Sequence, residues 1–402
     1  MEFNDNSRHL RSTEDITEAL KSAGVKEVSL HNVSQVLYYL PNEEANQDCR
    51  LLELDDQLLE MVEKGESFTF QGRVDETAVL CTKNRTYEVR EAETSNSLLL
   101  VPDFKFSSQS NINDSSRILE HKDVKGIFYK YYEIRECKPQ LPKLLTLLDP
   151  SSFKGQEYES SIDSAALFDW DKLRNEIQAS EAELLQALDD YLIININGYF
   201  RLISFECEAR SVTLMLDLLD ENSWEVDEVD REITYDALKN LIIKPVLDTL
   251  FKKYAEVSEK KKDDGSPLYK YNEIKTCKLL AKVLLAASPV TEYKQFMESW
   301  HIGTPDKMTP KDEYLSGIAL VIWNKKLSRK EVISYPETSL PRDITARFHA
   351  LFKVKSKWTV QEITPYIINL TTSKMNVQAL LTKYARCSMS NGVKLYSSKY
   401  DN

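Results

Sequence analysis

The chain has 402 residues, of which 42% are hydrophobic, and this length allows two to four domains whose cores need neither disulfides nor metals. Only ten residues are glycine, well below the usual frequency of about 7%; none forms a Gly-x-Gly turn and none precedes a lysine. The sequence therefore excludes nucleotide-binding loops of the Rossmann and Walker types, which need glycines so that backbone N–H groups can approach phosphates.

The five histidines and six cysteines are scattered, without any spacing that gathers metal ligands. Carboxylate pairs such as Asp189 and Asp190 are adjacent, so their side chains diverge on a helix or strand, and no Gly-x-Ser-x-Gly motif is present. We therefore expect no enzyme: no catalytic residue, no metal and no cofactor. The isolated cysteines, the charged N-terminus and the lack of a long apolar run predict a soluble intracellular protein without a membrane span.

Charge is unevenly distributed, although the chain as a whole carries −12. Residues 342–402 contain ten basic and three acidic side chains, a net charge of +7, which leaves −19 for the rest. A basic terminal module on an acidic body is typical of a protein that meets a polyanion at one end and other proteins elsewhere. The alternative is a basic surface that is merely solvated.

The opposite extreme lies between Glu206 and Asp236, where eleven carboxylates face only Arg210 and Arg231. This acidic stretch is expected to repel nucleic acid. Its two interpretations are a solvated connector and a surface on which another protein docks.

The first hundred residues predict short strands around two helices. A capping box at Ser12 and Asp15 begins a helix that ends at Gly24, and residues 55–65 predict a second one. Five or six short apolar runs separated by polar turns indicate a small barrel or curled sheet. The edges of such a sheet are either blunted or completed by another chain.

The middle of the chain changes pattern. Residues 106–116 predict a polar connector, and residues 117–148 predict a helical stretch that ends before Pro150. Two short amphipathic helices follow, over residues 168–177 and 180–191, and then two apolar runs around Asn197 and Gly198, the strongest short hairpin signal. Helices followed by a two-stranded hairpin make up the winged-helix plan.

The same plan recurs twice. Residues 273–288 and 291–300 predict helices, Thr309 and Pro310 begin a further helix that runs to about residue 322, and residues 321–336 predict a hairpin with a basic tip. The last group consists of three predicted helices, over residues 342–354, 358–370 and 376–389, and a closing strand over residues 392–398.

We therefore expect an α+β protein with a small β-barrel-like N-terminal domain followed by three tandem winged-helix domains. The predicted parts are a β-rich partial barrel (1–110), a helical connector (111–163), a first winged helix with an acidic helical extension (164–262), a second winged helix (263–340) and a third, basic, DNA-binding winged helix (341–402).

Within the last group, Thr359 and Glu362 form a capping box, while Pro365 predicts either a kink or a helix that begins at Thr364. The third helix has a clear core-facing arc, made of Val377, Leu380, Leu381, Tyr384 and Ala385. Its opposite face, which a helix-turn-helix derivative inserts into the major groove, carries Gln378, Thr382, Lys383, Arg386 and Met389.

Cations on this face and around the closing hairpin suit contact with the phosphate backbone. The candidates for DNA binding are Lys374, Lys383, Arg386, Lys394, Tyr396 and Lys399, with weaker candidates Lys325, Lys326, Arg329 and Lys330 at the tip of the preceding hairpin. No group of side chains forms a base-reading set, so we expect weak sequence selectivity and strong salt dependence. The alternative is that this module docks on protein.

The C-terminal motifs also carry a resemblance to a known family. Residues 357–367 (KWTVQEITPYI) and 379–398 (ALLTKYARCSMSNGVKLYSS) resemble the end of the Dcc subunit of the alternative replication factor C clamp loader, which serves sister-chromatid cohesion. Residues 93–102 (ETSNSLLLVP) and 130–148 (KYYEIRECKPQLPKLLTLL) are similar to patterns earlier in that family, so the resemblance spans most of the chain.

The resemblance implies partners that composition does not reveal. Residues 1–110 would form part of a composite barrel with the smallest loader subunit and the C-terminal tail of the large ATPase subunit. The remainder would be winged helices that end in a DNA-binding pair, and the assembly would tether the loader to the leading-strand polymerase epsilon during loading of the PCNA sliding clamp. ATP hydrolysis would belong to partner subunits.

Carried over residue by residue, the matching positions are Lys383, Tyr384, Arg386, Asn391, Gly392, Val393 and Lys394. We assign Lys383, Arg386 and Lys394 to single- and double-stranded DNA, and Tyr384 to the core. The expected protein is thus a nuclear, chromatin-associated adaptor. The alternatives are a sequence-specific winged-helix transcription regulator and a winged-helix scaffold that binds only proteins.

Overall fold

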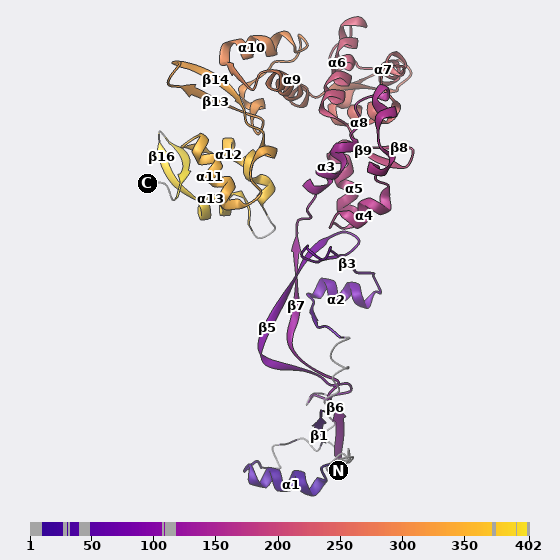
Figure 1. Cartoon of the computed structure of the whole chain (residues 1–402), viewed down its shortest axis with the longest axis vertical. Helices are drawn as coiled ribbons and strands as arrows, with labels where there is room; N and C mark the ends of the chain where they lie inside the picture. Colours follow the sequence, from indigo (N-terminus) through magenta and orange to yellow (C-terminus); the bar gives the residue numbers. More distant parts are fainter. Residues whose placement is uncertain are drawn as a thin grey trace. The chain divides into compact units, whose positions relative to one another are not determined.

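The computed structural model describes residues 10–26, 30, 33–39, 49–106, 108, 118–371, 375–390 and 392–399. The chain divides into two compact units, one made of Met1–Thr82 and Thr86–Glu136, the other of Lys83–Arg85 and Cys137–Asn402. Figure 1 follows the chain through both units. The first unit extends past residue 110, because strands that follow residue 117 pair with strands that precede residue 101.

The two helices predicted in the first unit are confirmed. Helix α1 (Thr13–Ser22) begins with the reciprocal Ser12–Asp15 capping box, and α2 (Asp56–Glu63) is capped by Asp55, whose side chain accepts a hydrogen bond from the Leu58 N–H. Leu58, Leu80 and Tyr87 form a small buried core between α2 and the sheet.

The strands of the first unit form a five-stranded sheet and a separate parallel pair. The sheet has the order β2-β7-β5-β4-β3, and β1 pairs with β6. Within the described residues this sheet is open, and the barrel stays a prediction. The strands are β1 (Val33–Tyr38), β2 (Leu52–Glu53), β3 (Thr69–Gln71), β4 (Val79–Cys81), β5 (Thr86–Leu100), β6 (Ile118–Asp123) and β7 (Gly126–Cys137).

The predicted helical connector is wrong over residues 118–137, which form β6 and β7. Residues 126–137 are rich in aromatic and β-branched side chains, which favour a pleated surface, and β7 finds its neighbour in β5, far away in the sequence. The only α-helix of the predicted connector that lies in the described residues is α3 (Pro142–Leu148), which begins with Pro142 at its first position.

The second unit begins with α3, α4 (Trp170–Glu176), α5 (Glu181–Asp190) and the hairpin of β8 (Ile193–Ile196) and β9 (Tyr199–Leu202). The predicted hairpin is confirmed: Asn197 and Gly198 both have positive φ, at 53° and 89°, as a tight two-residue turn requires. Ser180 and Glu183 form the predicted capping box of α5.

Three further helices and a hairpin follow, and their apolar side chains join one large core with those of the next group. These elements are α6 (Phe205–Glu221), α7 (Arg231–Leu238), α8 (Lys244–Tyr254), β10 (Ala255–Lys261) and β11 (Pro267–Tyr271). The next group comprises α9 (Glu273–Ala287), β12 (Val290–Glu292), α10 (Tyr293–Ile302), β13 (Ala319–Asn324) and β14 (Arg329–Ser334), with the strands in the order β12-β14-β13.

The helix expected from Thr309 to about residue 322 is wrong. This segment contains only a short 3-10 turn, Asp312–Leu315, before β13 begins at Ala319. Gly317 separates the two, with a φ of 81°, a left-handed conformation that glycine adopts without strain. A Cβ at this position would lie 3.1 Å from Cβ of Pro365, so the close approach of Pro365 also favours glycine here.

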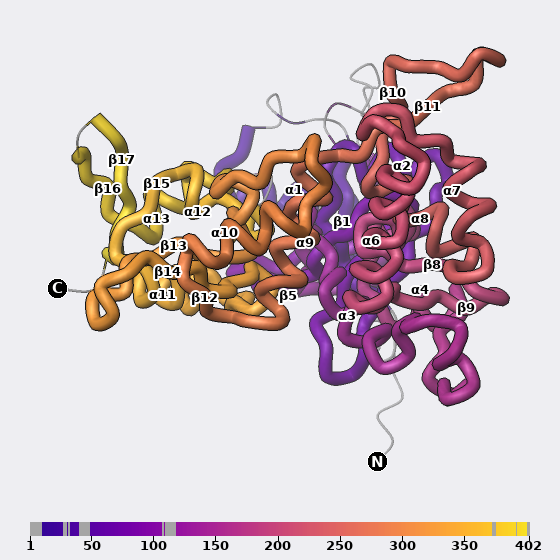
Figure 2. Tube along the Cα trace, turned by 90° about the horizontal axis from the view of Figure 1, so that it is seen from above, coloured from indigo at the N-terminus to yellow at the C-terminus, as the bar shows by residue number. Residues whose placement is uncertain are grey.

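The last group repeats the order of helix, short strand, helix and hairpin with one more α-helix before the hairpin, and again its first strand pairs with the last (Figure 2). Thr359 caps α12, which begins at Val360 and continues through Pro365, so the helix does not start at Thr364. The elements are α11 (Ile344–Val354), β15 (Trp358–Thr359), α12 (Val360–Ile367), α13 (Val377–Tyr384), β16 (Ala385–Ser390) and β17 (Val393–Ser398).

The hairpin β13–β14 lies between the last two groups. Ala319 belongs to the large core, while its neighbour Leu320, which points to the opposite face, belongs to the core of the last group. The Tyr366 hydroxyl also donates a hydrogen bond to the Ala319 carbonyl, at 3.3 Å. One face of this hairpin therefore packs on the helices of its own group, and the other face packs on the last group.

Candidate nucleic-acid interface

Helix α13 presents the core-facing arc that the sequence predicts. Leu380 and Leu381 are fully buried, and Val377 and Tyr384 pack against the same core. The ring of Tyr384 stacks on Phe348, with ring centroids 5.4 Å apart and planes 20° apart. The assignment of Tyr384 to the core is thus confirmed, and the exposed side of α13 is left to Gln378, Thr382 and Lys383.

The sequence predicts Arg386 and Met389 on the exposed face of this helix, but neither residue lies on it. Helix α13 ends at Tyr384, and both residues belong to strand β16. The segment Cys387–Ser390 contains serine and cysteine, which are poor helix formers, and β17 offers it a complete antiparallel partner. The sequence pattern does not reveal this partner, because the 100° periodicity continues past the helix end.

The register of the hairpin β16–β17 separates two of the predicted cations. Arg386 pairs with Ser397, and Met389 pairs with Lys394. Since side chains alternate between faces along a strand, Arg386 and Lys394 lie on opposite faces. Lys399 donates a hydrogen bond to the Lys383 carbonyl, at 3.1 Å, so Lys383, Arg386 and Lys399 gather at the base of the hairpin while Lys394 lies near its tip.

Tyr396 is a core residue, which corrects its assignment to DNA. Only 2% of it is exposed, and its hydroxyl accepts a hydrogen bond from Gln378 Nε2, at 3.1 Å. Tyr396 lies on the central strand of the sheet opposite the fully buried Trp358, and both side chains face the core. Lys374 and Asn391 lie outside the described residues.

The basic side chains of residues 341–399 are of two kinds: some are held in ion pairs within the fold, and others are exposed and can contact a ligand. Arg347 is buried and pairs with Glu337, and Lys355 lies 2.6 Å from Glu362. Burial alone would raise the pKa of Glu362, but hydrogen bonds from Lys355 and Thr359 outweigh it and lower this pKa. The exposed cations that form no ion pair within the described residues are Arg342, Lys353, Lys357, Lys383, Arg386, Lys394 and Lys399.

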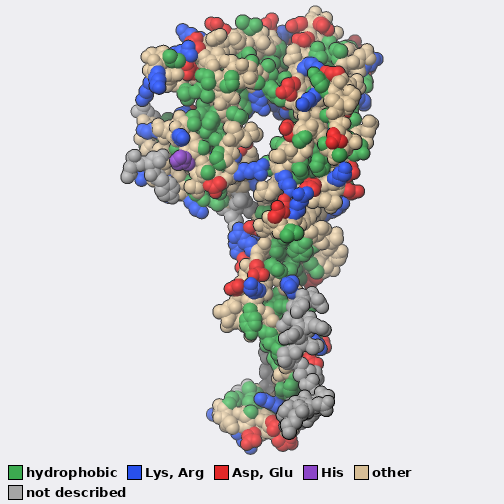
Figure 3. Space-filling model, in the orientation of Figure 1, with side chains coloured by type: hydrophobic (Ala, Val, Ile, Leu, Met, Phe, Trp, Pro, Cys, Tyr) green, Lys and Arg blue, Asp and Glu red, His purple; other side chains and the backbone are tan. Residues whose placement is uncertain are grey.

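At the tip of β13–β14, two of the four weaker candidates are held by the fold. Arg329 pairs with the buried carboxylate of Glu331 at 2.8 Å. Lys330 lies 3.7 Å from Asp312, and its Nζ is 3.5 Å from the centroid of the Tyr293 ring. Lys325 and Lys326 are exposed in the turn and form no ion pair within the described residues. On the face drawn in Figure 3, basic side chains lie at the end of this hairpin.

Part of the acidic stretch between Glu206 and Asp236 forms ion pairs with two lysines of a hairpin that lies later in the sequence. Lys260 lies within 2.9 Å of both Asp227 and Glu228, and Lys262 lies 2.6 Å from Asp230. Hydrogen bonds from Lys260 lower the pKa of both Asp227 and Glu228. Sequence reasoning missed this pairing, because Lys260 on β10 and Lys262 in the turn after it follow the acids by about thirty residues.

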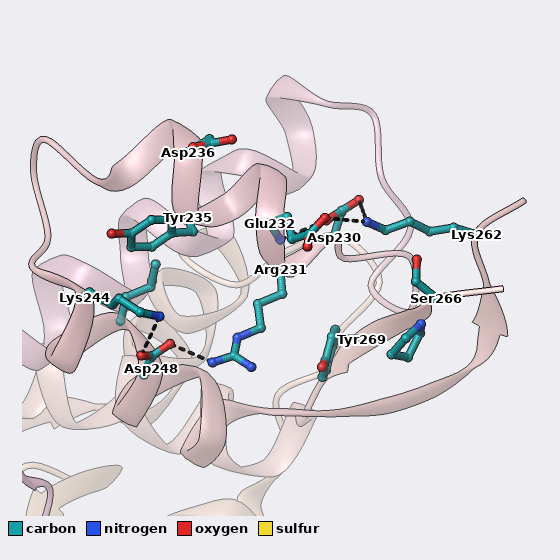
Figure 4. A pocket seen from close by; sticks show the side chains of 12 residues that line it. Asp230, Arg231, Glu232, Tyr235, Asp236, Lys244, Asp248, Lys262, Ser266 and Tyr269 are labelled. Carbon is teal, nitrogen blue, oxygen red and sulfur yellow. Dashed lines mark hydrogen bonds and ion pairs between the residues drawn. The ribbon is translucent and has the colours of Figure 1, made fainter. Parts of the chain in front are cut away.

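Beside these pairs lies an open pocket of about 580 Å³ (Figure 4). Arg231 and Lys244 both contact Asp248 in it, at 2.6 and 2.9 Å. Burial alone would raise the pKa of Asp248, but hydrogen bonds from these two cations lower it. Since the charges of the pocket compensate one another, it is a weaker candidate for a polyanion site than the terminal hairpins.

Within the described part of the chain, no cluster of histidine, cysteine and carboxylate side chains could hold a metal ion. No helix among the described residues combines the length and the apolarity that crossing a bilayer requires.

Sequence comparisons identify the family. A family model described as "Sister chromatid cohesion protein Dcc1" matches residues 49–367. The chain is 33% identical over 391 residues to the sister chromatid cohesion protein DCC1 of Xenopus laevis, covering 97% of this chain and 98% of the relative. It is 34% identical over 354 residues to the human protein of that name, covering 88% of each chain. These matches confirm the resemblance, and the chain belongs to the Dcc1 family of sister chromatid cohesion proteins.

Proposed function

We propose that the chain is a non-catalytic adaptor subunit of an alternative clamp loader, which tethers the loader to DNA and to polymerase epsilon while PCNA is loaded in the nucleus. Its family ties it to sister chromatid cohesion. The observation that carries the DNA-binding part is the group of exposed cations without ion pairs around α13 and β16–β17, in a chain whose other charges are mostly acidic.

We further propose that residues 273–334 and 341–399 are winged-helix modules. Two features support this: in each, the first short strand pairs with the last strand, and the last two strands form a hairpin after the helices. In such modules the helix before the hairpin enters a groove and the hairpin contacts phosphates. The two hairpins lie on the same side of the second unit in Figures 1 and 2, so one nucleic acid could contact both.

The proposed partner surface lies in the first unit. Strand β5 runs from Thr86 to Leu100, but β4 pairs only with its first three residues, Thr86 to Glu88. Beyond Glu88, this edge of β5 has no neighbouring strand within the described sheets. Leu98, Leu99 and Leu100 are also exposed at its end. A free edge with apolar side chains is a template for strand addition, which fits assembly with the smallest loader subunit and the tail of the large ATPase subunit.

Charge reversal tests the DNA-binding part. The double variant Lys383→Glu with Arg386→Glu should weaken binding of duplex and single-stranded DNA by the full-length chain. Because each phosphate contact on duplex DNA adds about 0.9 to the salt slope, the slope should fall by about 1.8. The matched control is Lys172→Glu with Arg174→Glu on α4, where both side chains are also exposed. Equal affinities and slopes for the two double variants would refute this assignment.

A random DNA pool separates the adaptor from a transcription regulator. The adaptor should select no consensus, because Gln378 is engaged with Tyr396 and no other side chain on the exposed face of α13 forms a bidentate base-reading pair. A sharp consensus would favour the regulator.

A further inference from the structure

Strand β13 carries an exposed tryptophan beside the basic turn. Trp323 is 63% exposed, whereas Trp300 and Trp358 are fully buried and Trp170 and Trp224 are half-buried. β13 is an outer strand of its sheet, so one side of the indole has no neighbouring strand within the described residues.

The surroundings of Trp323 are cationic. Trp323 pairs across the hairpin with Lys330, which lies over the ring of Tyr293, so the three side chains form a row of aromatic, cation and aromatic groups. In the adjoining turn, Asn324 Oδ1 accepts hydrogen bonds from the backbone N–H groups of Lys326 and Leu327, at 3.0 and 3.2 Å. The turn is therefore ordered, while the side chains of Lys325 and Lys326 stay exposed.

Two carboxylates beside the hairpin, Glu331 and Asp312, are already engaged. Glu331 accepts hydrogen bonds from Arg329 Nε and Asn324 Nδ2, at 2.8 and 2.9 Å, and hydrogen bonds from Asn324 and Arg329 lower its pKa. Asp312 accepts a hydrogen bond from the Tyr293 hydroxyl, at 2.8 Å, and faces Lys330. Neither carboxylate forms an ion pair with Lys325 or Lys326, so both side chains stay available to a ligand.

We propose that Trp323 is a stacking platform for an unpaired base of single-stranded nucleic acid, whose adjoining phosphates are bound by Lys325 and Lys326. An exposed indole beside unpaired cations matches the two needs of such a ligand, a flat face for the base and positive charge for the backbone. Bases inside a duplex offer no free face, so this platform selects single strands or the unpaired end of a duplex. An acidic peptide would use the lysines but has no base to stack on the indole.

This proposal rests on the proposed DNA-binding function, and Trp323→Ala in the full-length chain tests it. Stacking is worth about 1–3 kcal/mol per base, so affinity for a short oligothymidylate should fall roughly 5- to 150-fold. Affinity for a blunt duplex and both salt slopes should stay unchanged, because no charge is lost. Trp323→Phe should restore most of the single-strand affinity, and Tyr158→Ala, another exposed aromatic position, should leave it unchanged.

Tryptophan fluorescence gives an independent readout. Oligothymidylate should quench the emission of the wild type but hardly that of Trp323→Phe, in which the four less exposed tryptophans remain. Thermal unfolding checks that each variant is folded. If Trp323→Ala disturbs the strand, Trp323→Phe still supplies a variant with an aromatic side chain of high strand propensity.

The outcomes separate the two proposals. Unchanged single-strand affinity in Trp323→Ala, together with a loss in the Lys383→Glu and Arg386→Glu variant, would overturn the stacking platform and keep the DNA-binding function. Absence of DNA binding by the wild type would overturn both. Polyglutamate could compete with the oligonucleotide for the wild type and quench Trp323 as strongly. That result would show that the tip of the hairpin binds acidic protein segments instead.

Discussion

The buried guanidinium of Arg347 forms an ion pair with the carboxylate of Glu337, which lies just outside the last group of helices. Arg347 also donates hydrogen bonds to the carbonyls of Tyr366, at 2.9 Å, and Leu340, at 3.3 Å. One side chain of the basic terminal segment thus joins α11, α12 and the preceding linker. It stabilises the fold and has no free donor face for DNA.

Arg347→Met should therefore lower stability without a direct effect on DNA contacts. Removing one partner leaves Glu337 and several carbonyls without their donor, which costs about 3 kcal/mol for a buried pair. Hydrogen exchange of α11 and α12 in the full-length chain should report this loss. Arg342→Met, at an exposed position, should change the free energy of opening measured by hydrogen exchange by no more than about 0.5 kcal/mol. Equal protection in the two variants would contradict the structural role of Arg347.

The capping box of α12 offers a second, smaller stability test. Thr359 Oγ1 accepts a hydrogen bond from the Glu362 N–H, at 3.2 Å, and Glu362 accepts one from the Thr359 N–H, at 2.9 Å. Thr359→Ala should lower the free energy of unfolding by about 1 kcal/mol, and Thr359→Ser should keep most of the stabilisation that the cap provides. Hydrogen exchange at the first turn of α12 distinguishes the two, and equal exchange in both variants would argue against the cap.

Asp230 should contribute an acid-sensitive part of the stability. Burial alone would raise its pKa, but hydrogen bonds from Lys262 and from the N–H groups of Ile233 and Glu232 outweigh it and lower the pKa. Because the folded pKa lies below the unfolded value of about 3.9, the contribution is present above that value and is lost as pH falls through the folded pKa.

The corresponding test compares wild type with Asp230→Asn over pH. The wild type should be more stable by a constant difference from about pH 7 to pH 5, and the difference should shrink below about pH 4. Asp263→Asn, at an exposed position in the adjacent hairpin turn, should follow the wild type throughout. Denaturant unfolding monitored at α7 measures the stability of the wild type and of both variants. A stability difference between the wild type and Asp230→Asn that stays constant down to pH 2 would contradict the lowered pKa.

Within the terminal hairpin, Arg386 and Lys394 should have unequal effects on duplex binding. Arg386 lies in the cluster with Lys383 and Lys399 at the base, while Lys394 is near the tip on the other face. A duplex that docks against α13 contacts the base of the hairpin before its tip. Arg386→Glu should therefore weaken binding more than Lys394→Glu. Titration at constant salt decides this, and a larger effect of Lys394→Glu would place the duplex against the tip.

Local signals in the sequence predicted the elements that they define. The capping boxes at Ser12, Ser180 and Thr359 and the turn at Asn197 and Gly198 depend on residues at most three apart, and each forms as expected. Long-range pairing was not predictable in this way. Strand β7 depends on β5, and the acids near Asp230 depend on lysines about thirty residues later.

The candidate site shows the same division. The buried arc of α13 follows from helical periodicity, so Leu380, Leu381 and Tyr384 were predicted correctly. The end of that helix depends on β17, so the sequence pattern places Arg386 on the wrong element. It also offers Tyr396, a core residue, as a DNA-binding candidate. Trp323 gave no signal in the sequence, since a tryptophan in an apolar run is usually a core residue.

The free edge of β5 leads to the last prediction, which concerns assembly. Leu98 and Leu100 lie on one face of the strand, since side chains alternate, and both are exposed. Covering them and pairing their backbone groups with an added strand would bury apolar surface and satisfy the edge. Leu98→Lys with Leu100→Lys should therefore reduce recovery of the two loader subunits when all three chains are co-expressed, because a charged edge resists strand addition.

Hydrogen exchange locates the effect. In the wild type, residues 89–100 should gain protection when the loader subunits are present, and the double variant should lose most of this gain. A matched control is Leu59→Lys with Val62→Lys, which introduces the same charges at exposed apolar positions of α2 away from the free edge. If both double variants recover the loader subunits equally well and β5 gains no protection in the wild type, the partner strand does not bind at this edge.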